Sequence, residues 1–134
     1  MVIPGSVKNI GDYAFSRKAF ETHNPITGQY NYQPIPEFST LTISEGVEVI
    51  GERAFRNHLY GHIIIPSTVT KIGKESFKHE KLPKKGMYLD IRAKNIDMQD
   101  SPVDEYFLAK YNKNKRKTGV YRLNIGWSYK KEFK

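Results

Sequence analysis

The fold of this chain is decided by one stretch of its sequence, Ile63-Ile64-Ile65-Pro66-Ser67-Thr68-Val69-Thr70-Lys71-Ile72-Gly73-Lys74-Glu75-Ser76-Phe77. The skeleton of this stretch is an isoleucine, a valine four residues later, an isoleucine–glycine pair, and a small residue followed by phenylalanine. The same skeleton begins at Ile3 and again at Ile43, so the chain contains three copies. Self-similarity of this kind is the signature of a repeat architecture.

Each copy has the residues expected of one turn of a solenoid. The segments Leu41-Thr42-Ile43 and Ile63-Ile64-Ile65 are rich in β-branched residues, which favours one short strand per turn. Pro66 ends the strand because proline cannot donate a hydrogen bond to a ladder. The valine and the second isoleucine are three residues apart, which is typical of an irregular or 3₁₀-like arc. Gly73 then permits either a positive-φ turn or a close approach between turns.

The spacing of the copies predicts an insertion. Positions 43 and 65 differ by 22 residues, which is a usual length for a leucine-rich repeat, whereas positions 3 and 43 differ by 40. The first copy therefore carries an insertion at about residues 17–39, in which Tyr30-Asn31-Tyr32 is predicted to be one strand of a hairpin. Insertions in repeats often lie on the binding face, so Tyr30, Tyr32 and Phe38 are candidate protein-binding residues. The alternative is that these aromatic side chains pack onto the solenoid.

A further strand follows the third copy. Leu89, Ile91 and Ala93 alternate with more polar residues, and Ile96 and Met98 are predicted to continue the same turn. These segments extend the solenoid over residues 1–99. In the preceding strands, Thr42 and Ile64 alternate with the core isoleucines, so we expect both to face outward as candidate protein-binding residues.

The skeleton resembles the BspA-type leucine-rich repeat of bacterial surface proteins, whose units read approximately Ile-Pro-x-x-Val-x-x-Ile-Gly-x-x-Ala-Phe. The resemblance implies a β-rich α/β solenoid, a short right-handed array of about three to four coils, and a role in recognition rather than catalysis. The family usually has a cysteine soon after the phenylalanine, which this chain lacks. The resemblance also implies a surface or extracellular location, and it carries over no binding residue.

Residues 100–134 are predicted to cap the solenoid, whose end would otherwise expose apolar surface. Ser101 is expected to be the N-cap of a helix with Pro102 at its first position, and the helix should end near residues 111–113. A hairpin of residues 119–123 and 127–129 is predicted to follow. This segment resembles a tail module that follows such repeats in some spirochaete BspA-like proteins.

The opposite end of the array shows no comparable cap in the sequence. Val2 and Ile3 would form an edge strand above an uncovered coil. We therefore predict that the chain forms a homo-oligomer, with Val2 and Ile3 as candidate self-association residues. The alternative is that the chain is a fragment whose preceding repeats are missing.

The net charge of +8 is unevenly distributed. Residues 1–67 contain five Lys or Arg and six Asp or Glu (net −1), whereas residues 68–134 contain seventeen and eight (net +9). One basic cluster supports an alternative function, the binding of a polyanion such as a sulfated glycan or nucleic acid. Its members are Lys110, Lys113, Lys115, Arg116, Lys117 and Arg122. The competing interpretation is a solvated loop.

The sequence lacks the motifs of an enzyme. It has no glycine-rich phosphate loop and no nucleophile elbow, and His58 and His62 are not joined by other residues at zinc-binding spacing. It contains no apolar run long enough for a transmembrane helix. The repeat begins at Val2, which leaves no room for a signal peptide, so the chain is expected to be either intracellular or already processed or truncated, with a periplasmic location left open. We therefore predict a non-enzymatic protein-interaction or adhesion module that uses no metal or cofactor.

Overall fold

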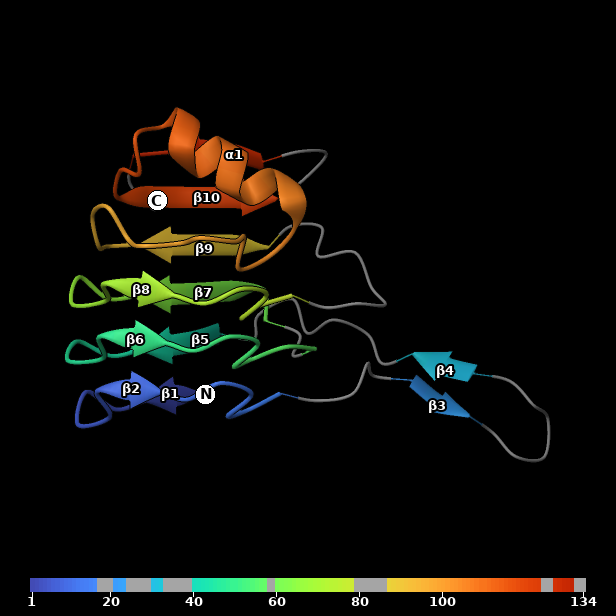
Figure 1. The fold of residues 1–134 in the computed structure, drawn as a ribbon. Helices are drawn as coiled ribbons and strands as arrows, with labels where there is room; N and C mark the ends of the chain where they lie inside the picture. Colours follow the sequence, from blue (N-terminus) through green and yellow to red (C-terminus); the bar gives the residue numbers. More distant parts are fainter. Residues whose placement is uncertain are drawn as a thin grey trace.

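The structure is a computed structural model that describes residues 1–16, 21–23, 30–32, 40–57, 60–78, 87–123 and 127–131. The side chains of residues 21–23, 30–32 and 123 lie outside this description. Two parallel arrays of short strands form the body of the molecule, with α1 at one end and the N-terminus at the other (Figure 1). Among the described residues, no helix is long and apolar enough to cross a membrane.

The larger sheet contains six strands, of which the first four are parallel to one another and the last two are added antiparallel. Its order is β1 (Val2–Ile3), β5 (Thr40–Ile43), β7 (His62–Ile65), β9 (Tyr88–Ile91), β10 (Gly119–Leu123) and β11 (Trp127–Lys130). The register pairs Ile3 with Ile43 and Ile65 with Ile91, so equivalent repeat positions lie directly side by side. The strand predicted from residues 89–93 is confirmed as β9.

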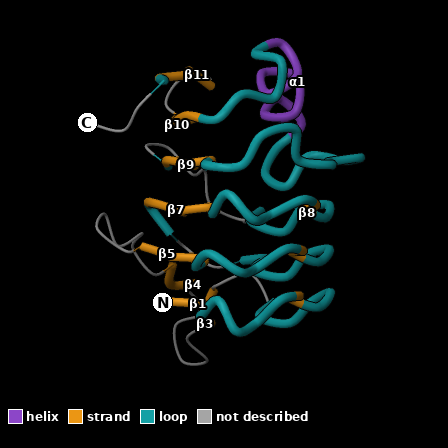
Figure 2. The backbone as a smooth tube through the Cα atoms, turned by 90° about the vertical axis from the view of Figure 1, so that its left-hand side faces the viewer, coloured by secondary structure: helices purple, strands orange, loops and turns teal. Residues whose placement is uncertain are grey.

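A second parallel sheet lies on the other side of each turn (Figure 2). Its order is β2 (Asn9–Ile10), β6 (Val49–Ile50) and β8 (Lys71–Ile72). The expectation of one strand per turn with a 3₁₀-like arc is therefore wrong at these residues. The repeat places the same backbone groups opposite one another in successive turns, so Gly51 N–H reaches Ile10 O (2.8 Å) and Gly73 N–H reaches Ile50 O (2.8 Å). We call one strand of each sheet, with the turn that joins them, a coil.

The core lies between the two sheets and consists of ladders of like side chains. Isoleucines of the skeleton are buried in every copy, and the final phenylalanine of each copy forms a stack. The ring centroids of Phe15 and Phe55 are 5.0 Å apart, and those of Phe55 and Phe77 are 5.8 Å apart. The phenylalanine at the end of the skeleton therefore forms a ladder through the three copies.

The repeat glycine serves close packing in the second and third copies, whereas a Cβ atom at Gly11 of the first copy would meet nothing within 4 Å, and none of the three glycines is left-handed. A Cβ atom at Gly51 would lie 2.6 Å from Asp12 N, and one at Gly73 would lie 2.5 Å from Glu52 N. The left-handed residues are instead found two positions later, at Tyr13 (φ 59°), Arg53 (φ 52°) and Glu75 (φ 53°). Of the two roles predicted for this glycine, the close approach between turns is the one that the structure has.

The C-terminal cap begins later than the sequence suggested. Helix α1 spans Glu105–Lys113, and Asp104 is its N-cap, accepting hydrogen bonds from Tyr106 N–H and Phe107 N–H. The predicted N-cap Ser101 and first helical residue Pro102 are therefore wrong. Their carbonyl groups are used by the neighbouring coil, because Ser101 O accepts from Glu75 N–H (2.9 Å) and Pro102 O accepts from Phe77 N–H (2.8 Å).

The rest of the cap agrees with the prediction. The helix ends at Lys113, and β10 and β11 form the expected antiparallel hairpin, which extends the larger sheet. Phe107 and Tyr111 are the buried residues of α1. The centroids of their rings lie 5.5 Å and 5.6 Å from the ring centroid of Tyr121. Together these elements cover the last coil (Figure 1).

The insertion contains a small sheet of its own. Strands β3 (Glu21–His23) and β4 (Tyr30–Tyr32) pair antiparallel, with Glu21 opposite Tyr32. The strand predicted at residues 30–32 is therefore confirmed as part of a hairpin. Phe38 lies outside the described residues.

Candidate functional site

The first coil exposes apolar side chains that the repeat elsewhere buries. Val7 is 36% exposed and Phe15 is 38% exposed, whereas the equivalent valine and phenylalanine of the next two coils are buried. Met1, Val2 and Tyr13 are exposed on the same coil. We call these five residues the first-coil surface. A further coil of the same shape would bury them in the way that each coil buries the next.

Within the described ranges of the chain, both sheets end in an unpaired edge strand at the first-coil surface. Strand β1 is bonded to β5 through Met1 O and Ile3 O, which accept from Thr42 N–H (2.9 Å) and Ser44 N–H (3.0 Å). Because backbone groups alternate in direction along a strand, those of Val2 point away from β5. Strand β2 is likewise the outer strand of the second sheet, and both edges lie at the N-terminal end of the stack (Figure 1). Such edges are templates for pairing with another chain.

Three of the predicted contact residues form one row across neighbouring strands. Val2 is in register with Thr42, and Thr42 is in register with Ile64. Val2 is 66% exposed, and Thr42 and Ile64 are half-buried. We call Val2, Thr42 and Ile64 the outer row, because it lies on the face of the sheet opposite the core. The structure therefore joins a predicted self-association residue to two predicted protein-binding residues.

Ile3 does not belong to this surface. Its side chain points to the other face of β1, is only 5% exposed, and packs in the ladder with Ile43. This corrects the expectation that Ile3 is a self-association contact, because side chains alternate between the two faces of a strand. Tyr30 and Tyr32 belong to β4, but their side chains are not described, and their role stays a prediction along with that of Phe38.

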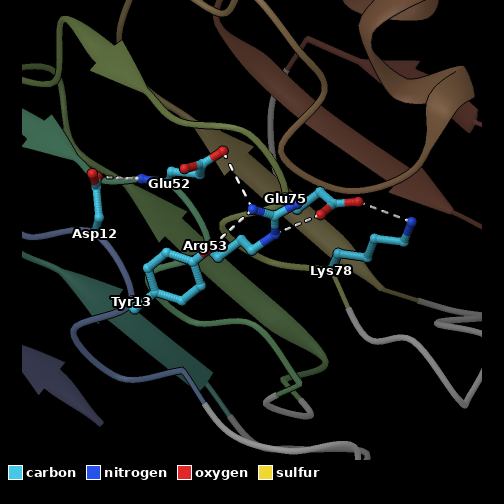
Figure 3. Close-up of polar contacts among 6 residues, drawn as sticks. All are labelled: Asp12, Tyr13, Glu52, Arg53, Glu75 and Lys78. Carbon is cyan, nitrogen blue, oxygen red and sulfur yellow. Dashed lines mark hydrogen bonds and ion pairs between the residues drawn. The ribbon is translucent and has the colours of Figure 1, made fainter.

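A ladder of polar side chains ties the first coil to the next two (Figure 3). The Arg53 guanidinium donates to Tyr13 Oη (2.9 Å) and to Glu75 Oε1 (2.8 Å), and Lys78 Nζ donates to Glu75 Oε2 (3.1 Å). In addition, Asp12 Oδ1 accepts from Glu52 N–H (2.8 Å). Tyr13, Arg53 and Glu75 all follow the repeat glycine by two residues, and this shared position was the signal in the sequence for their contact.

The hydrogen bonds of the ladder raise the pKa of Arg53, which bonds to Tyr13 and Glu75, and lower the pKa of Glu75. Burial by itself would raise the pKa of Glu75, but hydrogen bonds from Lys78 and Arg53 outweigh it and hold the pKa below the ordinary value of 4.5. Glu75 is therefore a carboxylate at neutral pH. The ladder holds Tyr13 in place at the margin of the first-coil surface.

The predicted basic cluster is divided by the fold. Arg116 is partly buried, and its guanidinium donates to Asn112 Oδ1 (2.8 Å) and Ile96 O (3.0 Å). Arg122 lies on the outer face of β10 and covers the Tyr88 ring, with 4.9 Å from its guanidinium carbon to the ring centroid. Lys110 and Lys113 lie on the last turn of α1. The fold thus gives the six residues different surroundings, and three of them, Lys115, Arg116 and Lys117, line one cavity.

Part of the cluster lines a cavity of about 520 Å³, which we call the basic pocket. Its lining residues are Lys94, Asn95, Lys115, Arg116, Lys117, Thr118, Tyr129 and Lys131. Five of these eight residues are cationic, and the lining as described contains no Asp or Glu. Lys94 and Lys131 were not predicted, because they are distant in sequence from residues 115–117 and only the fold brings them there.

In the described ranges, no group of three or more His, Cys, Asp or Glu side chains gathers at a distance suited to a metal.

The parallel coils, the isoleucine and phenylalanine ladders and the 22-residue register define a leucine-rich-repeat protein. Residues 1–83 match the family described as BspA type leucine rich repeat region (6 copies), and the chain therefore belongs to this family. No similar protein was found among curated proteins or among solved structures. Leucine-rich-repeat domains generally mediate protein–protein interaction or adhesion, and they are typically non-enzymatic.

Proposed function

We propose that this chain is a non-enzymatic protein-interaction module that self-associates through its first-coil surface. The observation that carries the proposal is the exposure of Val7 and Phe15 at positions where the following coils are fully buried. Fully burying a side chain of this size contributes about 1.5–3 kcal/mol, and Val7 and Phe15 would gain only the part of this that belongs to their exposed surface, 36% and 38%. The natural occupant is another coil of the same skeleton, and a second copy of the chain supplies one.

The geometry favours a closed dimer over a fibre. Helix α1 and the β10–β11 hairpin cover the last coil, so the first coil is the open end of the described array. Two copies can then meet only through the same surface, which is an isologous, two-fold arrangement. The two β1 strands would run antiparallel and join the larger sheets of both subunits.

The side-chain charges of the first coil do not oppose this contact, and the Met1 ammonium is engaged by Thr40 O (3.0 Å). Residues 1–16 contain one Lys and one Asp, so the side chains of two facing coils add no net charge to the interface. The contact is therefore expected to depend mainly on apolar burial, which resists salt.

The right-handed winding of the array and its count of about three to four coils are part of the same proposal.

The outer row supplies the surface for a protein partner. Dimerisation through β1 would place Val2 of one subunit next to Val2 of the other, with Thr42 and Ile64 following on the next strands of each subunit. The row would then extend across the continuous sheet, with β-branched side chains alternating with the core positions. An apolar, partly exposed row of this kind suits contact with protein.

A cysteine cross-link tests the proposed dimer directly, because the chain contains no cysteine of its own. Val2→Cys should form a disulfide-linked dimer rapidly under mild oxidation, since the antiparallel β1 strands bring the two positions close together. Tyr106→Cys is the matched control, because Tyr106 is 68% exposed at the opposite end of the molecule. Equal, slow cross-linking of the two variants on non-reducing gels would count against the interface.

A second candidate function is the binding of a polyanion through the C-terminal half. The observation that favours it is the basic pocket, where five cationic residues converge. The two candidates differ in their response to salt, because polyanion affinity falls steeply with ionic strength whereas an apolar interface is nearly indifferent.

A further inference from the structure

We propose that the basic pocket binds a sulfated sugar unit of an anionic glycan. The inference rests on the second candidate function and is independent of self-association. The cavity of about 520 Å³ falls within the range of small-ligand sites, roughly 300–1,000 Å³. It therefore has room for a sugar with its charged substituents and is not simply a flat basic patch.

The lysines of the pocket keep their charge available for a ligand. Some cations outside the pocket are paired, as in Lys78 with Glu75 (3.1 Å) and Arg92 with Asp90 (3.2 Å). Within the described parts of the chain, no ion pair involves Lys94, Lys115, Lys117 or Lys131. Four ammonium groups around one cavity repel one another, and an oxyanion between them would relieve that repulsion.

The two loops that carry these lysines are fixed to each other before any ligand arrives. Asn95 N–H donates to Arg116 O (3.1 Å), and the Arg116 guanidinium returns a bond to Ile96 O (3.0 Å). Arg116 is thus a positioning residue that holds the loop of Lys94 against the loop of Lys115 and Lys117. Preorganisation of this kind lowers the entropic cost of binding.

The third segment that lines the pocket, strand β11, is also held in place. Tyr129 Oη donates to Thr118 O (2.6 Å), and Tyr121 Oη donates to Lys117 O (3.0 Å). These bonds join β11 and β10 to residues 117 and 118. The pocket is therefore built from three segments whose backbones are held by side chains of the cap itself.

The chemistry of the lining favours a sulfated glycan over nucleic acid. Binding of a nucleic-acid strand uses several aromatic rings on which successive bases stack. Among the described residues, the lining has one aromatic ring, that of Tyr129, which packs against Tyr121 at 5.1 Å between centroids. The guanidinium of Arg116 is already bonded to Asn112 and Ile96. The remaining cations are lysines, which act as point charges and suit sulfate groups on a flexible ligand.

The test compares two double variants that remove the same charge. Lys94→Gln with Lys117→Gln removes pocket lysines, and Lys110→Gln with Lys113→Gln removes lysines of α1 outside the lining. Binding of a heparin octasaccharide is followed by calorimetry. We expect the pocket variant to bind at least about tenfold more weakly with a shallower dependence on salt, and the helix variant to stay within about twofold of the original chain.

A third variant separates binding from folding. Lys115 has φ 57°, where glycine is favoured, so Lys115→Gly should remain folded while it loses one pocket charge. Weaker heparin binding with an unchanged or higher unfolding midpoint supports the inference. The same loss in both double variants would overturn it, because diffuse charge would then explain the binding.

Two ligand controls complete the design. Tighter binding of single-stranded DNA than of heparin, or equal binding of unsulfated hyaluronan, would also overturn the inference. If the original chain binds no polyanion at all, the second candidate function fails together with the pocket. If the original chain binds heparin but the pocket variants bind it equally well, only the assignment of binding to the basic pocket is contradicted.

Discussion

At the scale of single residues, one position of the repeat joins the coils. Tyr13, Arg53 and Glu75 share a left-handed backbone, which is unusual for residues other than glycine. That conformation brings their side chains to the same corner of the stack, where they meet in the polar ladder. The strain of each residue is offset by hydrogen bonds from its backbone to the neighbouring coil, such as Tyr13 N–H to Glu52 O (2.9 Å).

The lowered pKa of Glu75 gives the stability of the chain a defined pH dependence. A carboxyl whose pKa is lower in the folded than in the unfolded state stabilises the fold above its unfolded pKa, and this contribution is lost as the pH falls through the folded pKa. We expect Glu75→Gln to reduce the free energy of unfolding at pH 7 by less than about 1 kcal/mol, because the pair is partly solvated. The difference should vanish below the ordinary carboxyl pKa of 4.5, once the pH has also passed the lower folded pKa.

Urea denaturation of both proteins between pH 7 and pH 3 measures this difference. A gap between the two proteins that widens toward acid pH would contradict the predicted sign. Glu105→Gln, which alters an acid of the first turn of α1, controls for the general loss of one negative charge.

At the scale of elements, the cap depends on a single aspartate. Asp104 accepts two backbone hydrogen bonds at the start of α1, and its carboxylate also accepts from Trp127 Nε1 (2.8 Å) on β11. One side chain thus begins the helix and ties it to the hairpin. The Trp127 ring in turn lies 4.9 Å from Phe107, in the core of the cap.

We predict that Asp104→Ala lowers the free energy of unfolding by about 1–2 kcal/mol, because it removes the N-cap and the bond to Trp127. Trp127 is the only tryptophan in the chain, so its fluorescence reports the same contact. Chemical denaturation followed by tryptophan emission measures both effects. Asp100→Ala removes the same charge outside the helix, and an equal loss in that variant would show that Asp104 has no special role.

The helices and strands also show how much of the structure could be predicted from the sequence. The repeated skeleton predicted the strands of the larger sheet and their core isoleucines, because burial on one face sets the spacing of apolar residues. The start of α1 was misplaced because Ser101-Pro102 is a typical helix start, whereas the carbonyl groups of both residues bond to the previous coil. The pocket residues Lys94 and Lys131 were missed because their proximity depends on tertiary structure.

At the scale of the whole molecule, the two ends of the solenoid differ. One end is closed by α1 and the hairpin, and the other exposes the first-coil surface and two sheet edges (Figure 1). The basic pocket lies in the closing cap, far along the stack from that surface. Self-association and anion binding would therefore use separate surfaces, and a dimer would present two pockets.

A charge placed on the first-coil surface should dissociate the dimer without unfolding the subunit. Val7→Glu adds a carboxylate at a side chain that is already 36% exposed, so the isolated subunit should tolerate it. In the interface the same carboxylate would be buried without a partner, and we expect the dissociation constant to rise at least about tenfold. Sedimentation velocity measures the change. Tyr106→Glu, at the far end, should leave the dimer intact, and dissociation by both variants would contradict the proposed surface.

The most direct test of self-association is the mass of the unmodified chain in solution, measured by light scattering after size exclusion at low and at high salt. The chain has a mass of 15.5 kDa, so the proposed dimer has twice that mass, about 31 kDa. We predict the dimer mass at high micromolar concentration, unchanged between the two salt conditions, because the interface is apolar. A mass of 15.5 kDa under both conditions would contradict the central claim that the first coil is an assembly surface.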